Sequence, residues 1–153
     1  MARKDEKGKR FEVLIGKIDE ALIDKYYVEA IALTYALFEE RTYTLLDRLN
    51  IPYKSKDKIF QCLEYFKNHV KTRNISVTPS CCSLDELIDW LKAEFLDYGL
   101  IDNIQKWREK RNDVIHDLAK QNIDYSDLEV LATEGRDYFR KYTSRIMSLK
   151  KKI

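Results

Sequence analysis

Glycine and proline are scarce in this chain of 153 residues, which contains four glycines and two prolines. Together they make up about 4% of the sequence, against about 12% in an average protein. Turn-rich β-sandwiches, collagen-like repeats and glycine-rich phosphate-binding loops need more glycine, more proline or both, so the composition excludes them. Apolar residues are 44% and charged residues 35% of the chain. This mixture is typical of an ordered helical domain, and we expect a single one over residues 1–153.

Residues that bind metals or form disulfides are also few. The three cysteines are Cys62, Cys81 and Cys82, an odd number without a C-x-x-C spacing, and the two histidines are His69 and His116. This set predicts free thiols, no metal site and no cofactor. The charged start MARKDEKGKR does not resemble a secretory signal, which favours a reducing, cytoplasmic location.

Long apolar runs are missing as well. None approaches the ~20 residues that span a bilayer, so we expect no membrane partner. The net charge of +2 is unevenly distributed. Residues 1–10 and 136–152 are basic, whereas the segment between them is acidic. Basic ends can attract a polyanion such as RNA, or they can simply keep helix ends solvated, and the sequence leaves both interpretations open.

Apolar residues recur with helical spacing along nearly the whole chain. The expected helices cover residues 9–25, 27–49, 57–72, 83–95, 102–120 and 126–149. The second of them is apolar over so much of its girth that we expect it at the centre, with its tyrosines in core or interface contacts. Capping patterns mark starts near Ser83, Asp102 and Ser126. The sequence therefore predicts an all-α bundle of five or six helices.

One arginine lies where an apolar residue is expected. On a helical wheel with Ile104 at zero, the apolar stripe of the fifth helix is centred near 330°, and Arg111 falls at about 340°. A guanidinium that faces the core is costly unless another group compensates its charge. One interpretation is a structural ion pair with Glu39, Glu40 or another inward carboxylate. The alternative is that Arg111 belongs to a functional site.

The residues that follow this arginine favour the functional interpretation. The segment Arg111-Asn-Asp-Val-Ile-His116 places a histidine five positions after the arginine and an asparagine directly next to it. This pattern resembles the signature of the HEPN family (higher eukaryotes and prokaryotes nucleotide-binding), in which four to six residues separate arginine from histidine. HEPN domains are compact helical bundles of about this length, with the motif on a late helix. The aromatic-rich segment ALTYALFEERTYTLLDRL is similar to their central helix.

The resemblance implies a metal-independent endoribonuclease that acts on RNA as a homodimer. In this chemistry His116 would take the proton of the 2′-hydroxyl, Arg111 would hold the charge of the phosphorane, and Asn112 would orient the imidazole or a phosphate oxygen. The products would be a 2′,3′-cyclic phosphate and a 5′-hydroxyl. The resemblance also suggests toxin, antiviral abortive-infection or stress-nuclease settings, with an antitoxin or regulatory protein as a further partner.

Helix geometry independently favours two chains. Arg111 and His116 are about 140° apart around the helix and separated by about 7.5 Å of rise, so one copy surrounds a phosphate poorly. Two such helices across a two-fold axis would bring both pairs to one cleft. One departure from the resemblance is Leu118, at the position where toxins of this family carry a tyrosine that receives silencing AMP groups, although Tyr125 follows later.

Two other readings of the sequence remain. One is a non-catalytic helical module that binds nucleotide, RNA or a protein partner through a vestigial motif. The other is an adaptor bundle with Arg111 in an internal salt bridge. The basic residues Arg136, Arg140, Lys141 and Arg145 are expected largely on one side of the last helix, where they could follow an RNA backbone or only contact solvent.

Overall fold

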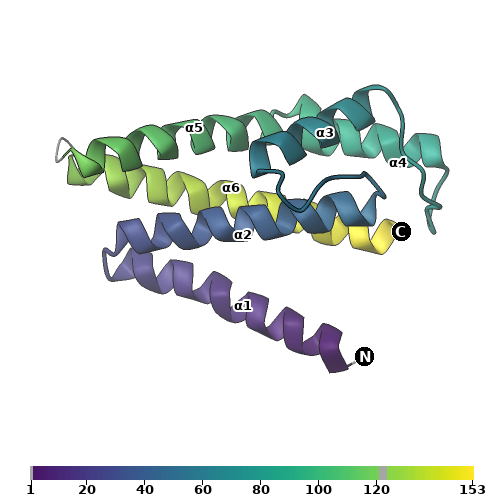
Figure 1. Ribbon diagram of the computed structural model, residues 1–153. Helices are drawn as coiled ribbons and strands as arrows, with labels where there is room; N and C mark the ends of the chain where they lie inside the picture. Colours follow the sequence, from purple (N-terminus) through teal and green to yellow (C-terminus); the bar gives the residue numbers. More distant parts are fainter. Residues whose placement is uncertain (1, 121–123) are drawn as a thin grey trace.

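The computed structural model describes residues 2–120 and 124–153, with side chains from residue 9 onward. These residues form helices and connecting loops without any strand, which confirms the all-α prediction (Figure 1). The elements are α1 (Ala2–Ile23), α2 (Tyr27–Arg48), α3 (Ile59–Lys71), α4 (Leu84–Leu91), the π-helix η1 (Lys92–Asp97), α5 (Leu100–Ala119) and α6 (Tyr125–Lys152).

Most helix boundaries lie close to the predicted ones, and the differences occur at the ends. Ser83 caps α4 as expected, since its hydroxyl accepts a hydrogen bond from the Glu86 amide at 3.1 Å. The predicted starts at Asp102 and Ser126 are wrong. Helix α5 begins after Gly99, whose positive φ of 78° turns the chain, and α6 is capped by the Asp124 carboxylate.

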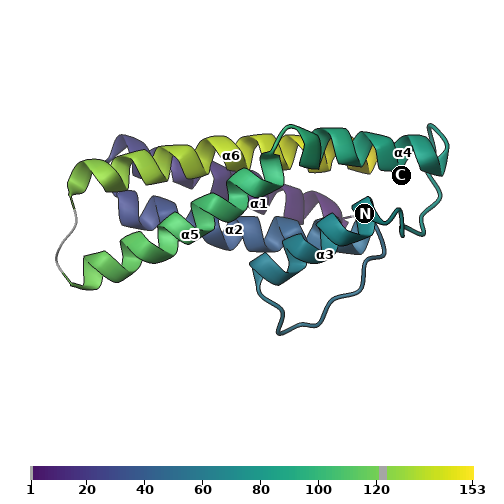
Figure 2. The same cartoon turned by 90° about the horizontal axis from the view of Figure 1, so that it is seen from above.

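Helix α2 lies at the centre of the bundle, as predicted from the apolar residues around most of its circumference. It packs against α1, α3 and α6, and α5 packs against α6 while crossing α2 (Figures 1 and 2). Aromatic rings at the centre of the core connect α5, the helix that carries Arg111 and His116, to α2 and α6. The Phe38 ring of α2 lies 5.3 Å, between ring centres, from Trp107 of α5 and from Phe139 of α6. The core therefore fixes α5 against both of its neighbours.

A close contact sets the position of α5 on α6. The Trp107 indole nitrogen donates a hydrogen bond of 2.8 Å to the backbone carbonyl of Leu131, a residue inside helix α6. The ring lies over Gly135, where a Cβ would come within 2.5 Å of it. Only glycine leaves room for this approach. The indole thus anchors the turn of α5 directly before Arg111.

Among the described residues, no helix is long and apolar enough to cross a membrane.

Candidate functional site

Arg111 follows the Trp107 anchor by one turn of α5 and points toward α2. Its guanidinium carbon lies 3.9 Å from the centre of the Tyr35 ring, and both side chains are half-buried. A cation over an aromatic face is attracted by the ring quadrupole. This contact explains how an arginine is accommodated on an otherwise apolar stripe.

The described residues include no carboxylate that pairs with Arg111, so the structure lacks the predicted ion pair with Glu39 or Glu40. The Glu39 carboxylate instead accepts a hydrogen bond from the Tyr43 hydroxyl at 3.3 Å. Arg111 donates from Nη1 to the Oδ1 atom of Asn112 at 3.1 Å, while its Nε is buried without a hydrogen-bond partner. The site therefore contains a positive charge that Tyr35 and Asn112 hold in place and no described anion neutralises.

His116 lies in the last turn of α5, and its side chain is exposed. No described residue forms a hydrogen bond or ion pair with its imidazole. Asn112 and Asp113 are also exposed, so the polar side of this helix is open to solvent between Arg111 and His116. Within one chain the imidazole is accessible, and the guanidinium lies against the neighbouring helix.

The apolar stripe of α5 is only partly covered beyond Trp107. Ile104 and Trp107 are buried as predicted, whereas Val114, Ile115 and Leu118 are half-buried. Of these three, Val114 is the one that packs on the buried core formed by the described residues. Near the end of α5, Ile115 and Leu118 therefore present apolar surface directly before and two positions after His116 in the sequence.

Tyr125 is the first residue of α6, and its hydroxyl is already engaged. It donates a hydrogen bond to the Lys25 carbonyl at 2.8 Å, and its ring lies 5.3 Å from that of Tyr27. This contact joins the turn between α1 and α2 to the start of α6. The hydroxyl is thus a structural donor.

The basic residues of α6 do not form one continuous surface. Arg136 and Arg140 face α1, where both pair with Asp19, at 3.7 and 2.8 Å. Arg145 pairs with Glu94 of η1 on another side, at 2.7 Å. The expectation of a single basic side is therefore wrong, because inter-helix ion pairs divide the cations between two neighbours.

Two features of the site were missed by sequence reasoning. Tyr35 contacts Arg111 because α2 and α5 cross at this point. The spacing of apolar residues within each helix does not predict where two helices cross. A second arginine, Arg41, is buried, with its guanidinium carbon 3.9 Å from the centre of the Phe11 ring. Burial lowers the Arg41 pKa below its usual value. The apolar residues one helical turn from Arg41, Leu37 and Phe38 before it and Leu45 after it, are the signal that could have indicated its burial.

In comparisons with known proteins, no family model, no curated protein and no solved structure matches this chain. Among the described residues, no group of three or more histidine, cysteine or acidic side chains is arranged to hold a metal ion. The functional interpretation therefore depends on the chemistry of Arg111, Asn112 and His116.

Proposed function

We propose that this protein is a metal-independent endoribonuclease of the HEPN type that works as a two-fold homodimer. The observation that carries the proposal is the state of Arg111: no described carboxylate neutralises it, it is held over Tyr35, and it shares a helix with the exposed imidazole of His116. Guanidinium donors match the oxygens of a phosphate, and histidine is the residue type that exchanges protons near neutral pH.

In the proposed reaction, the His116 imidazole removes the proton of a ribose 2′-hydroxyl. The 2′-oxygen then attacks the adjacent phosphorus, and Arg111 stabilises the additional negative charge of the phosphorane. The bond from phosphorus to the 5′-oxygen breaks, and an imidazolium returns a proton to that leaving oxygen. The products are a 2′,3′-cyclic phosphate and a 5′-hydroxyl, and DNA is not cleaved because it lacks the nucleophile.

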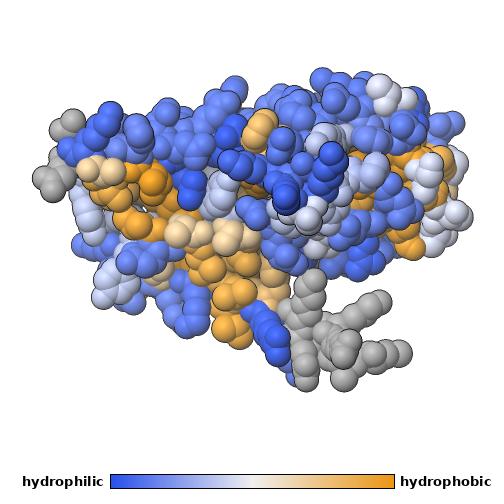
Figure 3. All heavy atoms as spheres, viewed as in Figure 1, coloured by the Kyte–Doolittle hydropathy of each residue, from blue (hydrophilic) through white to orange (hydrophobic). Residues whose placement is uncertain are grey.

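A second copy of the chain completes the site in this proposal. The orientations of Arg111 and His116 on α5 support it, since the two side chains of one copy do not converge on a phosphate. The surface near them supports it too: hydrophobic residues extend from the end of α5 across α2 toward α1 (Figure 3). Ile115 and Leu118, near the end of α5, are themselves half-exposed. Covering them in a dimer would remove apolar area from water.

The proposal is tested by incubating the protein with RNA in excess EDTA and analysing the product ends. We expect cleavage to persist with chelator and to leave cyclic phosphates. Arg111→Ala should lower kcat/KM by about 10²- to 10³-fold, as loss of one charge-stabilising donor does. His116→Ala should lower it by about 10²- to 10⁴-fold, as loss of a general base does.

Two variants serve as controls. His69→Gln removes the other histidine, which bonds to the Tyr65 carbonyl at 2.8 Å, and Lys110→Ala removes a neighbouring cation whose partner is Glu134. Both should cleave RNA at the rate of the unaltered protein. Cleavage that disappears with chelator, or that persists in both Arg111→Ala and His116→Ala, would overturn the mechanism. A dimer that binds RNA and never cleaves it would instead identify a non-catalytic module.

The biological setting that we propose is a toxin, an abortive-infection effector or a stress nuclease under the control of an antitoxin or another regulatory protein. Leu118 and the engaged hydroxyl of Tyr125 argue against silencing by transfer of AMP to a tyrosine near the motif. A regulator that covers the cleft of the dimer would fit this site better.

A further inference from the structure

A groove runs between the α4–η1 segment and the C-terminal half of α6, at the end of the molecule opposite the last turn of α5 (Figure 1). It consists of two pockets of about 450 and 360 Å³, which share Glu94 and Arg145 as a common wall. Pockets of this size are within the range that accommodates small organic ligands. Neither pocket includes Arg111 or His116.

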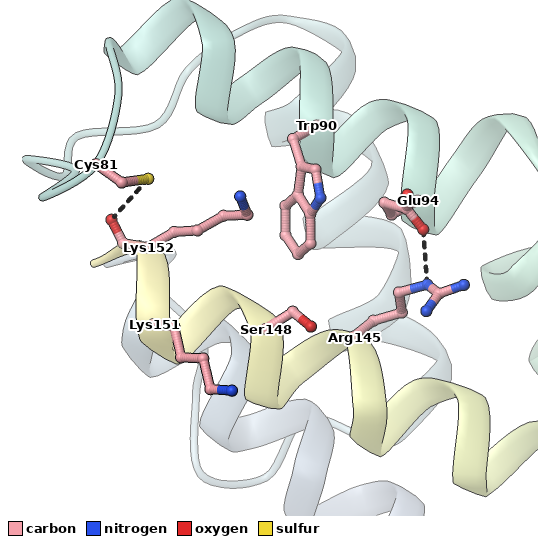
Figure 4. Close-up of a pocket in the computed structure, with 7 residues that line it drawn as sticks. All are labelled: Cys81, Trp90, Glu94, Arg145, Ser148, Lys151 and Lys152. Carbon is pink, nitrogen blue, oxygen red and sulfur yellow. Dashed lines mark hydrogen bonds and ion pairs between the residues drawn. The ribbon is translucent and has the colours of Figure 1, made fainter.

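The larger pocket has an aromatic wall with cations beside it (Figure 4). The half-buried Trp90 ring extends from α4 into the space facing α6, and the Lys152 ammonium lies 5.0 Å from its centre. The Arg145–Glu94 ion pair of 2.7 Å closes one end. The backbone carbonyl of Lys152, which accepts from the Cys81 thiol at 3.9 Å, closes the other. A flat ligand can therefore enter against the indole, close to positive charge.

The smaller pocket repeats this combination of aromatic and basic groups. Tyr98 is 78% exposed at the end of η1, and the half-buried Tyr138 lies on α6. Lys141 contributes a cation, in addition to the shared Arg145. Exposed aromatic side chains beside cations are the elements with which proteins bind unpaired nucleic acid, since every base has a face that stacks and every linkage has a charged phosphate.

The charge of the groove favours an anionic ligand. Arg145, Lys141, Lys151 and Lys152 provide four cations, and Glu94 is the one carboxylate among the residues that line the two pockets. Arg145 uses its Nε for Glu94, which leaves both terminal nitrogens without a hydrogen bond to any described residue. Lys141 and Lys151 are exposed and have no ion-pair partner in the described part of the chain. These donors are available for phosphate oxygens.

The π-helical segment gives a second reason to regard this wall as functional. Six residues, Lys92–Asp97, form η1 directly after α4, and this segment supplies Glu94 to both pockets. π-helices are rare, and such segments occur frequently at functional sites.

We propose that this groove binds a single-stranded RNA segment, with one base stacked on Trp90, the next base against Tyr98 or Tyr138, and the phosphate between them on Arg145. The choice of RNA over DNA as the natural ligand rests on the proposed function. The stacking and phosphate contacts do not involve the 2′-hydroxyl, so a DNA strand can make the same contacts in a binding test. The groove would hold the substrate strand at a distance from the residues that cleave it.

The test measures binding of fluorescein-labelled octanucleotides by anisotropy. A DNA strand serves as a probe that cannot be cleaved, and RNA of the same sequence is measured with the Arg111→Ala protein. Trp90→Ala should weaken binding of both strands by about tenfold, because a base loses its stacking partner, and Trp90→Phe should restore most of the affinity. Lys151→Ala should weaken binding and reduce the slope of its salt dependence by about one.

Lys92→Ala is the matched control, because Lys92 is the first residue of η1 but its exposed side chain lines neither pocket. It should leave binding unchanged. Wild-type affinity in Trp90→Ala, or an equal loss in Lys92→Ala and Lys151→Ala, would overturn the proposal. Binding of AMP as tight as that of the octanucleotide would also overturn it, because the second pocket would then contribute nothing. Loss of cleavage in His116→Ala is a separate result, so the two proposals can fail independently.

Discussion

Arg111 lies with its guanidinium carbon 3.9 Å from the centre of the Tyr35 ring, and this contact joins the helix that carries the candidate motif to the central helix of the bundle. The ring occupies the place that a carboxylate would take in a structural ion pair. Because an aromatic ring carries no net charge, it orients the cation without neutralising it.

The first prediction concerns this ring. Tyr35→Ala should lower the rate of RNA cleavage by about 2- to 30-fold, which corresponds to the ~0.5–2 kcal/mol of a cation–π contact. Tyr35→Phe keeps the aromatic face and should cleave at nearly the unaltered rate. Single-turnover kinetics check this, with melting temperatures to show that both variants fold. An unchanged rate in Tyr35→Ala would mean that the ring does not position Arg111.

The second prediction concerns the composite site. Arg111→Ala and His116→Ala should each be impaired by at least about 10²-fold alone, whereas a mixture refolded together should recover part of the cleavage activity. Recovery is expected because the mixed dimer brings an intact arginine from one chain to an intact histidine from the other. Sedimentation velocity would establish that dimers form. A mixed dimer without activity would show that each site lies within a single chain.

The third prediction concerns the packing of α5 on α6. Gly135→Ala should destabilise the fold by about 1–3 kcal/mol, because the new methyl group would lie 2.5 Å from the Trp107 ring and force it to move. Gly16→Ala is the control, since a Cβ there has no neighbour within 4 Å. It should be neutral or stabilising by up to about 1 kcal/mol, as expected for alanine in a helix. Urea unfolding of both variants measures the difference; equal stabilities would refute the close contact.

The fourth prediction concerns the thiols. Burial, with smaller contributions from Asp57 and Glu39, raises the pKa of the Cys62 thiol to about 11, so little of the reactive thiolate forms at pH 8. Cys81 is exposed and should react first with a disulfide reagent, followed by Cys82. Cys62 should react only after denaturation. Three equally fast thiols in the native protein would contradict the burial of Cys62.

The fifth prediction follows from the same raised pKa and concerns alkaline stability. Burial also raises the pKa of Tyr43 to about 12, with Glu39 adding to the effect. Both groups hold their protons in the folded protein at a pH where the unfolded chain releases them. Their stabilising contribution is therefore complete below about pH 9 and is lost between about pH 9 and 12. Urea midpoints measured across this range should fall, and they should fall less in Cys62→Ala than in the unaltered protein.

Helical periodicity predicted a bundle of five or six helices and their approximate positions, because one buried face per helix leaves a regular apolar pattern in the sequence. It also identified α2 as central and Arg111 as an unusual residue on an apolar stripe. The helix starts were less predictable. Gly99 begins α5 through its left-handed backbone, so the capping pattern at Asp102 lies inside the helix.

The surroundings of the candidate site depend on contacts between distant segments, which local patterns do not encode. The pairing of Arg111 with Tyr35 requires the crossing of α2 and α5. Trp90 and Arg145 are 55 positions apart in the sequence and meet only because α4 and η1 lie along α6. The sequence gives no local sign of the π-helical turn that carries Glu94.

The hydrogen bond between Tyr125 and Lys25 spans 100 positions of sequence, as does the buried one between Thr42 and Tyr142. The central helix of this bundle thus obtains its main neighbour, α6, from a segment that is synthesised about 100 positions later. During synthesis, α1 and α2 emerge before α6. The apolar face of α2 that packs on α6 therefore stays exposed until α6 has been made. The bundle therefore cannot close before α6 has been translated, and a chain that stops short of α6 would be a ready target for chaperones and proteases.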